Sequence, residues 1–311
     1  MKRIRFTYKP HLYIGYIVFL CLACIDKADS TTVDLYKDTE TTDDGGNNDD
    51  SENNNSENNT LKTKTIDITQ NIEGVNITRT FRLQTPTSID TLKNYPLVFA
   101  FHGRGGNKDN WIRTLKKFTD SGEFIGVYPQ GYLESWNLGS EPSKADDTEF
   151  VNKIVTELKT YSNLNFEKMY AIGTSNGSAL VNQLAIETTH FKAIAPIVSQ
   201  LIESQVFHDN MEPISVYQIC GAEDTVIPIS GGDKLGHVFL DALESAKKWA
   251  NHFGCDTNSK TTIQSEDTLY TFDNCDNGIV INYLRVENGS HNIQEEIPNL
   301  YDIIWEFFQL F

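Results

Sequence analysis

A serine between two glycines is the first feature of the sequence that could do chemistry. Ser175 lies in Gly173-Thr174-Ser175-Asn176-Gly177, directly after an apolar strand-like run and directly before a stretch with helical periodicity. A sharp strand-to-helix turn of this G-x-S-x-G type needs both glycines because backbones pass close together there, and the turn exposes the serine hydroxyl. A glycine loop with a helix-capping serine is the alternative. The strand and helix on either side favour Ser175 as a nucleophile.

A serine hydroxyl is a weak nucleophile until a base takes its proton, so a histidine must be able to reach Ser175. The chain has seven histidines. Where such a turn carries the nucleophile, the chain order is serine, then acid, then histidine. His291 fits this order because it follows the last apolar run, residues 279–286, and precedes the final helical stretch. We predict that His291 is the general base; a surface-loop histidine is the alternative.

The acid of such a triad should follow a strand that lies between the serine and the histidine in the chain. The apolar run 214–219 leads into a loop that contains Asp224. We predict that Asp224 orients the imidazole and stabilises the imidazolium. Glu223 and Asp233 are competing carboxylates in the same region.

A glycine-rich loop could supply part of an oxyanion hole. Acyl transfer needs backbone N–H donors, one from the residue after the nucleophile and one from a loop after an early strand. Asn176 is predicted to give the first, and Arg104, within His102-Gly103-Arg104-Gly105-Gly106, the second. The loop lacks the Lys-Ser/Thr ending of a phosphate-binding loop and the dinucleotide spacing G-x-G-x-x-G.

Apolar runs and amphipathic stretches alternate along the chain and must position these residues. Alternation of this kind predicts an α/β fold with a mostly parallel, doubly wound sheet, and residues 75–83 with 64–69 predict an N-terminal antiparallel edge hairpin. The expected inner strands are 96–101, 124–128, 169–172, 193–198, 214–219 and 279–286. Helical spacing of apolar residues is found in 150–161, 180–184, 242–253 and 303–310.

From about residue 65 to 311 the chain resembles the polyhydroxybutyrate depolymerase, feruloyl esterase and acetylxylan esterase group of secreted α/β-hydrolases. The resemblance implies an α/β-hydrolase fold, serine esterase activity and a disulfide between Cys255 and Cys275. It rests on Pro96-Leu97-Val98 leading to His102-Gly103, Tyr128-Pro129-Gln130-Gly131, Ser135-Trp136-Asn137, Asp146-Asp147, the Ser175 turn, Gly221 to Pro228 with Gly231-Gly232, and Trp249 leading to Gly254-Cys255.

Several departures from the family pattern lie where a substrate would bind. A second glycine after the turn is replaced by Ser178, the early glycine loop carries Arg104, and His291 is followed by Asn292-Ile293 instead of Trp-Pro. No one relative's substrate can therefore be carried over. Trp136 is predicted to line the cleft and stack on an aryl group or sugar, with a packed loop tryptophan as the alternative.

Two further charged features have more than one interpretation. Arg104 could pair with an anionic substrate group such as a uronate, or it could be solvated. Asp146 and Asp147 precede a helix, where favourable interaction with the helix dipole is sufficient explanation for at least one of them.

The N-terminus has the pattern of an export signal. Four basic residues precede an apolar run that ends at Ala23, before Cys24. We predict a lipoprotein signal peptide over 1–23, a lipidated Cys24, a disordered acidic tether over 24–60 and a hydrolase domain over 61–311. A plain cleaved signal and an uncleaved anchor are the alternatives; a Ca²⁺ loop in the tether would need a ligand spacing that is lacking. The expected location is the cell envelope, at a bacterial outer membrane or the cell surface, with the lipid as the membrane contact.

Composition excludes some classes of partner. The 311 residues carry a formal net charge of −17, so a nucleic-acid partner is not expected. Outside the export signal and its cleavage site at Cys24, no Cys-x-x-Cys pair or histidine cluster suggests a metal, so no metal or cofactor is predicted. Of the other cysteines, Cys21 would leave with the signal and Cys220 is expected to be a buried thiol.

The sequence therefore predicts a lipid-anchored serine carboxylesterase that removes feruloyl or other acyl groups from polysaccharides or oligosaccharides. The same residues could cleave an aliphatic polyester, such as a polyhydroxyalkanoate, which is the nearest alternative. A serine peptidase of related fold and a non-catalytic glycan-binding lipoprotein are more distant alternatives.

Overall fold

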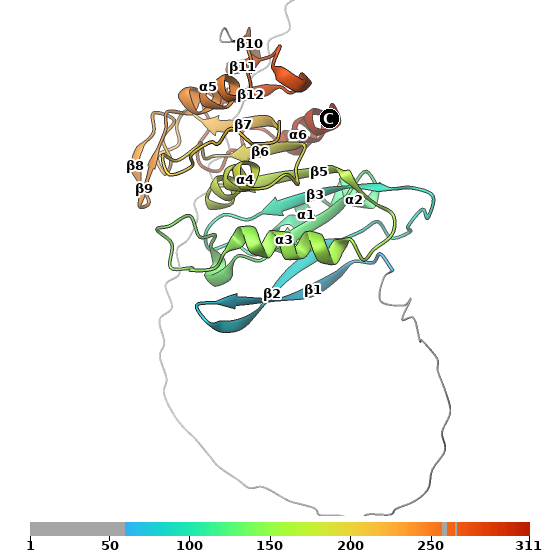
Figure 1. Cartoon of the computed structure of the whole chain (residues 1–311). Coiled ribbons are helices and arrows are strands. Elements are labelled where there is room, and N and C mark those ends of the chain that lie inside the picture. The colour runs from blue at the N-terminus through green and yellow to red at the C-terminus, as the bar shows by residue number, and fades with distance from the viewer. Residues whose placement is uncertain (1–59, 257–259, 265) are drawn as a thin grey trace, which may run out of the picture. The chain divides into compact units, whose positions relative to one another are not determined.

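The fold is built on a ten-stranded sheet in the order β1-β2-β4-β3-β5-β6-β7-β12-β11-β10 (Figure 1). The computed structural model describes residues 60–256, 260–264 and 266–311. The inner strands, from β4 to β12 in this order, pair in parallel, and antiparallel strands extend the sheet at both edges. The strands of this sheet are β1 (Lys64–Ile72), β2 (Val75–Gln84), β3 (Tyr95–Phe101), β4 (Ile125–Pro129), β5 (Leu164–Thr174), β6 (Ala193–Ile197), β7 (Ser215–Gly221), β10 (Lys260–Gln264), β11 (Asp267–Phe272) and β12 (Ile281–Val286).

The antiparallel hairpin expected at the N-terminal edge is formed by β1 and β2, in a register that opposes Lys64 to Leu83. Glu73 and Gly74 make its turn with positive φ angles of 50° and 87°, a left-handed turn that matches the twist of paired strands. The side-chain oxygen of Asn71 accepts a hydrogen bond from the Gly74 N–H at 3.0 Å. The mostly parallel sheet with an antiparallel N-terminal hairpin is confirmed.

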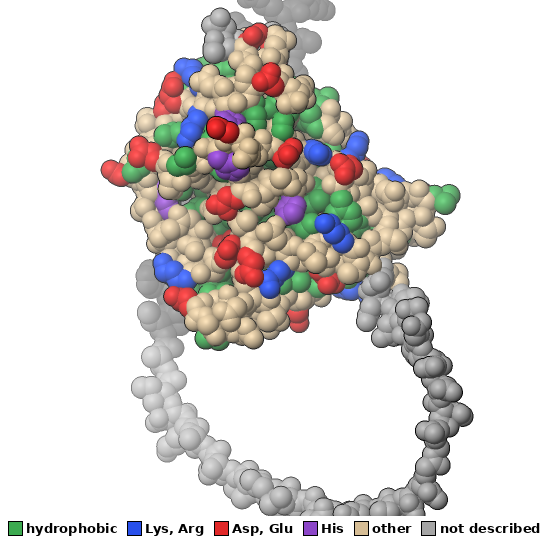
Figure 2. Space-filling model, in the orientation of Figure 1, with side chains coloured by type: hydrophobic (Ala, Val, Ile, Leu, Met, Phe, Trp, Pro, Cys, Tyr) green, Lys and Arg blue, Asp and Glu red, His purple; other side chains and the backbone are tan. Residues whose placement is uncertain are grey.

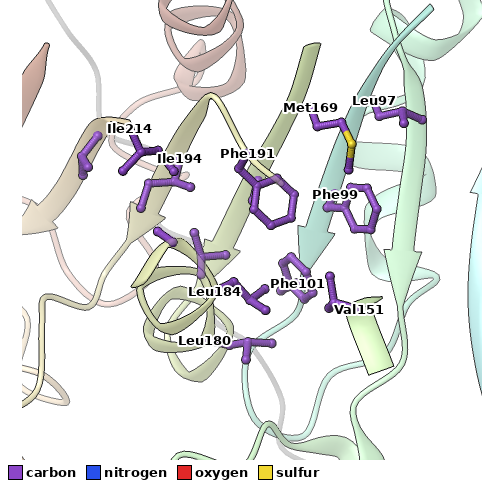
Figure 3. Close-up of a cluster of buried hydrophobic side chains, with 14 of the residues drawn as sticks. Leu97, Phe99, Phe101, Val151, Met169, Leu180, Leu184, Phe191, Ile194 and Ile214 are labelled. Atoms are coloured by element: carbon purple, nitrogen blue, oxygen red, sulfur yellow. The ribbon is translucent and has the colours of Figure 1, made fainter. Parts of the chain in front are cut away.

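The inner strands are apolar on both sides because helices cover both faces of the sheet. In β3, Leu97, Phe99 and Phe101 belong to a core with side chains of α3 and α4 (Figure 3). Side chains of α5 belong to the same core. The alternate residues Val98 and Ala100 pack in a second core with α1, α2 and α6. The helices are α1 (Asn110–Thr114), α2 (Lys116–Asp120), α3 (Asp147–Leu158), α4 (Asn176–Glu187), α5 (Ala242–His252) and α6 (Leu300–Phe308), with 3₁₀ turns η2 (Tyr132–Glu134) and η3 (Asp276–Gly278).

A separate two-stranded hairpin, which the sequence did not reveal, precedes α5. It consists of β8 (Gly232–Lys234) and β9 (His237–Phe239) and turns through Leu235 and Gly236, which have φ angles of 53° and 85°. Strands β10 and β11 were likewise not expected. These are short strands with mixed polar composition, so they lack the long apolar runs that marked the inner strands.

The sheet topology brings four loops to one edge. Strands β3, β5, β7 and β12 are all part of the parallel set, so their carboxyl ends face the same way. The loops after them begin at His102, Ser175, Ala222 and Glu287. In open α/β sheets, ligands bind outside the carboxyl ends of the strands.

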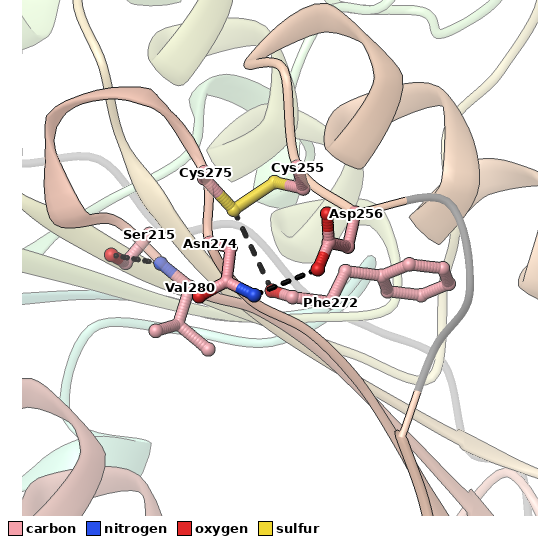
Figure 4. The surroundings of a disulfide bond; sticks show 7 residues. All are labelled: Ser215, Cys255, Asp256, Phe272, Asn274, Cys275 and Val280. Carbon is pink, nitrogen blue, oxygen red and sulfur yellow. Dashed lines mark hydrogen bonds between the residues drawn. A yellow bond between two sulfur atoms is a disulfide. The ribbon is translucent and has the colours of Figure 1, made fainter.

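The disulfide implied by the family resemblance is present between Cys255 and Cys275, which lie 20 residues apart (Figure 4). It joins the end of the α5 segment to the turn that precedes β12. Beside it, Asn274 donates a side-chain hydrogen bond to Asp256 at 2.7 Å. Cys220 is a free, buried cysteine, and burial raises the pKa of its thiol.

The predictions for the N-terminus, namely the signal peptide over 1–23, lipidation at Cys24 and the acidic tether up to residue 59, lie outside the described residues. Within the part that the structure describes, no helix has the length and apolar content that crossing a membrane requires.

Candidate active site

Ser175 lies at the tip of a strained turn between β5 and α4. Its backbone has φ 54° and ψ −119°, a conformation that L residues rarely adopt. A methyl group at Gly173 would lie 2.2 Å from the Gly177 carbonyl oxygen, and one at Gly177 would lie 2.4 Å from the Phe101 carbonyl oxygen, so only glycine fits at either position. Among the described residues, the Ser175 hydroxyl caps no N–H of α4, unlike in the helix-capping alternative.

Ser175, His291 and Asp224 form a continuous chain of hydrogen bonds. The Ser175 hydroxyl lies 2.9 Å from His291 Nε2, and His291 Nδ1 lies 2.6 Å from Asp224 Oδ2. The other carboxylate oxygen, Oδ1, accepts hydrogen bonds from the backbone N–H groups of Val226 at 2.8 Å and Ile227 at 2.9 Å. Because a carboxylate only accepts, Nδ1 carries the imidazole proton and Nε2 is free to accept the serine proton.

Direct backbone contact between two loops brings the acid to the histidine. The Glu223 N–H donates to the Gly289 carbonyl at 2.9 Å, and a methyl group at Gly221 would lie 2.2 Å from that same carbonyl oxygen. Within the described residues, the competing carboxylates Glu223 and Asp233 make no hydrogen bond to His291. Of the three carboxylates, Asp224 is the one that is hydrogen-bonded to His291, and its role as the acid stays a prediction.

The two expected oxyanion donors flank Ser175. A methyl group at Gly103 would lie 3.5 Å from Ser175 Cβ, so the loop that carries Arg104 runs directly against the serine. Asn176 begins the 12-residue helix α4, whose N-terminus carries positive partial charge. The structure gives the backbone N–H groups of Arg104 and Asn176 no hydrogen-bond partner among the described residues. Both are available to a ligand, and their role as oxyanion donors stays a prediction.

His102 supports this loop from the buried side. Its Nδ1–H donates to the Gly103 carbonyl at 2.8 Å, and Nε2 accepts from the Gly131 N–H at 3.0 Å and from the Gln130 side chain at 3.2 Å. Burial lowers the pKa of His102, which outweighs the opposite effect of its bond to Gly103. The ring is therefore neutral, and its hydrogen bonds hold the glycine loop in place.

The prediction that Trp136 lines the cleft is wrong. Its side chain is completely buried, its indole N–H donates to the His102 carbonyl at 2.7 Å, and it is not among the residues that line the cleft. The indole also packs edge-on against Phe101. Trp136 is thus a packed loop tryptophan, and it acts as a second brace for the glycine loop.

The two aspartates that precede α3 have different roles. Asp146 is the N-cap and accepts the Glu149 N–H at 2.8 Å, as helix-terminal charge suggested for at least one of them. Asp147 is buried, forms an ion pair with Arg79 at 2.7 Å and accepts the Asn137 N–H at 2.7 Å. Asp147 therefore anchors the loop that contains Trp136, although it lies away from the cleft.

The triad opens into a cleft of about 450 Å³. One part of its wall is apolar and includes residues from the β8–β9 hairpin, and another part carries charged or titratable side chains. Figure 2 shows acidic, basic and apolar side chains interspersed on the visible face of the molecule. The cleft residues are Gly103, Arg104, Leu138, Glu141, Thr174, Ser175, Asn176, Ala179, Ile197, Val198, Ser199, Val226, Ile227, Leu235, His237, Phe239, His291, Asn292, Ile293 and Gln294.

Two titratable residues of this wall, Glu141 and His237, were not assigned to the site from the sequence. Glu141 is almost completely buried between Arg104 and His237. Burial alone would raise the pKa of Glu141, but hydrogen bonds from His237 and from the Leu138 backbone outweigh it, and the pKa is lowered. No local pattern singles out Glu141, because its side-chain partners Arg104, Asn176 and His237 come from distant segments. Elsewhere, within the described residues, no group of three or more His, Cys, Asp or Glu side chains is arranged to hold a metal ion.

Comparison with solved structures defines the fold. An acetyl xylan esterase from Aspergillus awamori aligns with a TM-score of 0.58 over 79% of this chain and 99% of that one, at 14% identity. The chain has the α/β-hydrolase fold. An acylaminoacyl peptidase from Pyrococcus horikoshii aligns with a TM-score of 0.52 over 80% of this chain and 42% of that one, at 13% identity. The fold alone therefore accommodates both ester and peptide hydrolysis.

No family model matches the chain. Its sequence is similar to several esterases, which confirms the resemblance. Feruloyl esterase B of Piromyces equi is 24% identical over 66% of this chain, and feruloyl esterase C of Emericella nidulans is 25% identical over 56%. A bifunctional acetylxylan esterase/xylanase of Neocallimastix patriciarum is 24% identical over 69%. The chain spans only 41%, 64% and 31% of these relatives' lengths, respectively.

Proposed function

We propose that this α/β-hydrolase is a serine carboxylic ester hydrolase that removes feruloyl or acetyl groups from polysaccharides or their fragments. The observation that carries the proposal is the hydrogen-bonded chain from Ser175 through His291 to Asp224, which ends in an open cleft. Similarity to feruloyl and acetylxylan esterases supports an ester of this class as the substrate.

The geometry supports a two-step mechanism through an acyl-enzyme. His291 Nε2 takes the Ser175 proton as Oγ attacks the ester carbonyl, and the Arg104 and Asn176 N–H groups stabilise the tetrahedral oxyanion. Collapse releases the alcohol of the polysaccharide, which takes the proton from His291. A water molecule, deprotonated by His291, then attacks the acyl-enzyme, and the second collapse releases the carboxylic acid and restores the Ser175 hydroxyl.

The apolar part of the cleft supports an acyl group without charge. Four apolar side chains line the same cleft as the serine: Ile197, Val198, Ile227 and Phe239. They would favour an aromatic or short aliphatic acyl group over a charged, strongly hydrated one. The same apolar wall would also suit a hydroxyalkanoate ester, so a polyhydroxyalkanoate depolymerase is the second candidate.

Location and domain boundaries form part of the same proposal. We infer an exported chain with its signal over 1–23, a lipid on Cys24, an acidic tether to residue 60 and a catalytic domain over 61–311. Such a chain would work in the cell envelope, held to a bacterial outer membrane or at the cell surface. Labelling with radioactive palmitate tests this: label in the wild type and none in Cys24→Ala would support it, and equal labelling of both would refute it.

The activity is tested by hydrolysis of p-nitrophenyl acetate, methyl ferulate, acetylated xylan and short hydroxybutyrate oligomers by the full chain, with Ser175→Ala as the matched control. Loss of activity in Ser175→Ala alone would support the serine mechanism, and the preferred substrate would separate the two candidates. Equal inactivity of both proteins on every ester would refute the esterase proposal and favour peptide cleavage or glycan binding.

A further inference from the structure

Glu141 is a buried carboxylate in the wall of the cleft that meets five hydrogen-bond donors. Its side chain is 1% exposed, and it lies in the loop between η2 and α3. A carboxylate buried to this extent is stable only if its oxygens are paired. Oε1 accepts from His237 Nε2 at 2.9 Å, Arg104 Nη2 at 3.0 Å and Asn176 Nδ2 at 3.3 Å, and Oε2 accepts from the backbone N–H groups of Leu138 at 2.9 Å and Ser140 at 3.2 Å.

One oxygen of Glu141 therefore holds the side chains of both residues whose backbone N–H groups form the proposed oxyanion hole. Arg104 lies between two glycines, and Gly105 has a φ of 76°, so its backbone has little steric restraint of its own. Asn176 is fixed more firmly, because its side-chain oxygen also accepts the Trp136 N–H at 2.7 Å. His102, Trp136 and a hydrogen bond from the Gly105 N–H to the Glu134 carbonyl at 2.8 Å hold the rest of this loop. Within the described residues, Glu141 is the hydrogen-bond partner of the Arg104 side chain, so Arg104 relies on it more than Asn176 does.

The negative charge of Glu141 and its hydrogen bonds should have opposite effects on the rate of hydrolysis. A carboxylate close to a developing oxyanion raises the energy of the tetrahedral intermediate, although the Arg104 guanidinium offsets this charge. If only charge mattered, removal of the carboxylate would speed hydrolysis. If its hydrogen bonds hold the donors in place, removal of the carboxylate would slow hydrolysis instead.

We propose that Glu141 is a positioning residue that ties Arg104 to Asn176 and so sets the spacing of the two oxyanion N–H donors. This inference rests on the proposed esterase function. A donor that is displaced contributes less to the transition state, and loss of one oxyanion donor in a hydrolase lowers kcat about 10²- to 10³-fold. Glu141 acts through other residues, so a smaller loss, about 10- to 100-fold, is expected.

The test compares Glu141→Gln, which removes the charge and keeps the shape, with Glu141→Asp, which keeps the charge but shortens the side chain by one methylene. Glu167→Gln is the matched control, because that carboxylate is 88% exposed and lies at the opposite end of β5 from the serine. The readouts are kcat and KM for p-nitrophenyl acetate and the inhibition constant of a boronic acid that forms a tetrahedral serine adduct.

Both Glu141 variants should lose kcat about 10- to 100-fold with KM changed less than about 3-fold, and should bind the boronic acid correspondingly more weakly, because the interaction is made only in the transition state. Glu167→Gln should match the wild type. A Glu141→Gln enzyme with wild-type or higher kcat would overturn the inference. So would a Glu141→Asp enzyme with wild-type kcat.

Arg104→Met is the second variant, in case the Glu141 variants do not fold. It removes the Arg104–Glu141 hydrogen bond from the Arg104 side and should also lower kcat with little change in KM. In the double variant, its effect should not add to that of Glu141→Gln. Wild-type kcat in Arg104→Met would overturn the inference. Failure of the esterase proposal is distinguishable, because the wild type would then be as inactive as Ser175→Ala.

Discussion

Replacement of Asp224 with asparagine should remove most of the ester hydrolysis while the protein stays folded. Asp224 Oδ1 accepts the Val226 and Ile227 N–H groups at 2.8 and 2.9 Å, so the single oxygen of an asparagine will occupy this place. The amide NH₂ then faces His291 Nδ1, where Oδ2 lies at 2.6 Å in the wild type. An NH₂ group can only donate, so it stabilises the tautomer with the proton on Nε2, which cannot accept the Ser175 proton.

The size of the effect follows from these bonds. To give the productive tautomer, the amide would have to turn over and leave the two backbone N–H groups unpaired, at about 1–3 kcal/mol each. The productive orientation is thus disfavoured by about 2–6 kcal/mol, or roughly 30- to 25,000-fold. Because an equivalent tautomer error in a serine protease lowers kcat about 10⁴-fold, the upper part of this range is expected.

The assay is the kcat and KM of Asp224→Asn with p-nitrophenyl acetate, together with its thermal unfolding midpoint. KM and the midpoint should change little, because the asparagine keeps both backbone bonds. Asp233→Asn, at an exposed position on β8, should behave like the wild type. Retention of more than about a tenth of the wild-type kcat by Asp224→Asn would refute the tautomer reasoning.

Three further predictions concern the framework of the site. Gly177→Ala places a methyl group 2.4 Å from a backbone oxygen of β3 and should lower the free energy of unfolding by at least about 1–3 kcal/mol in urea titrations; an unchanged midpoint would contradict this. Asp147→Ala leaves the buried Arg79 charge unpaired and should cost about 3–5 kcal/mol, most of which the double variant Arg79→Met/Asp147→Leu should restore; equal instability of the two proteins would count against it. Burial lowers the pKa of His102, so on acidification the unfolded chain takes up this proton near pH 6.5, before the folded chain does. The contribution of neutral His102 to the free energy of unfolding is therefore complete above pH 6.5 and is lost as the pH falls toward the lower pKa of the folded state. His102→Gln should lack this part of the slope in unfolding measurements between pH 7 and 5, and identical slopes would argue against it.

The inner strands could be predicted because nearly all of their side chains are buried, whichever face of the sheet they lie on. The run from Leu97 to Phe101 is buried on both faces, so its composition reports the parallel sheet directly. Chain order then placed Ser175, Asp224 and His291 at one edge, since strand ends in a parallel sheet coincide. The hydrogen bonds between these three side chains are a property of the folded loops, which sequence order alone does not specify.

Other parts of the site could not be predicted because they depend on contacts between distant segments. Trp136 lies in a loop without periodicity, so nothing in the sequence distinguishes an indole that faces the cleft from one that faces the core. Glu141 is joined to residues 37, 35 and 96 positions away along the chain. The β8–β9 hairpin has only three residues in each strand, too few for an alternating pattern to be recognised.

The β8–β9 hairpin forms part of the cleft wall, but it does not hold the triad. Leu235, His237 and Phe239 contribute to the cleft wall, whereas the triad is held by backbone contacts among other loops. The two ends of the hairpin lie side by side, since a methyl group at Gly231 would lie 2.5 Å from the Phe239 carbonyl oxygen. Because His237 also donates to Glu141, a hairpin of different length or composition grafted between these points should keep His237. Such a graft would change the apolar wall at Leu235 and Phe239, and with it the acyl groups that fit, while the backbone contacts that hold the triad stay as they are.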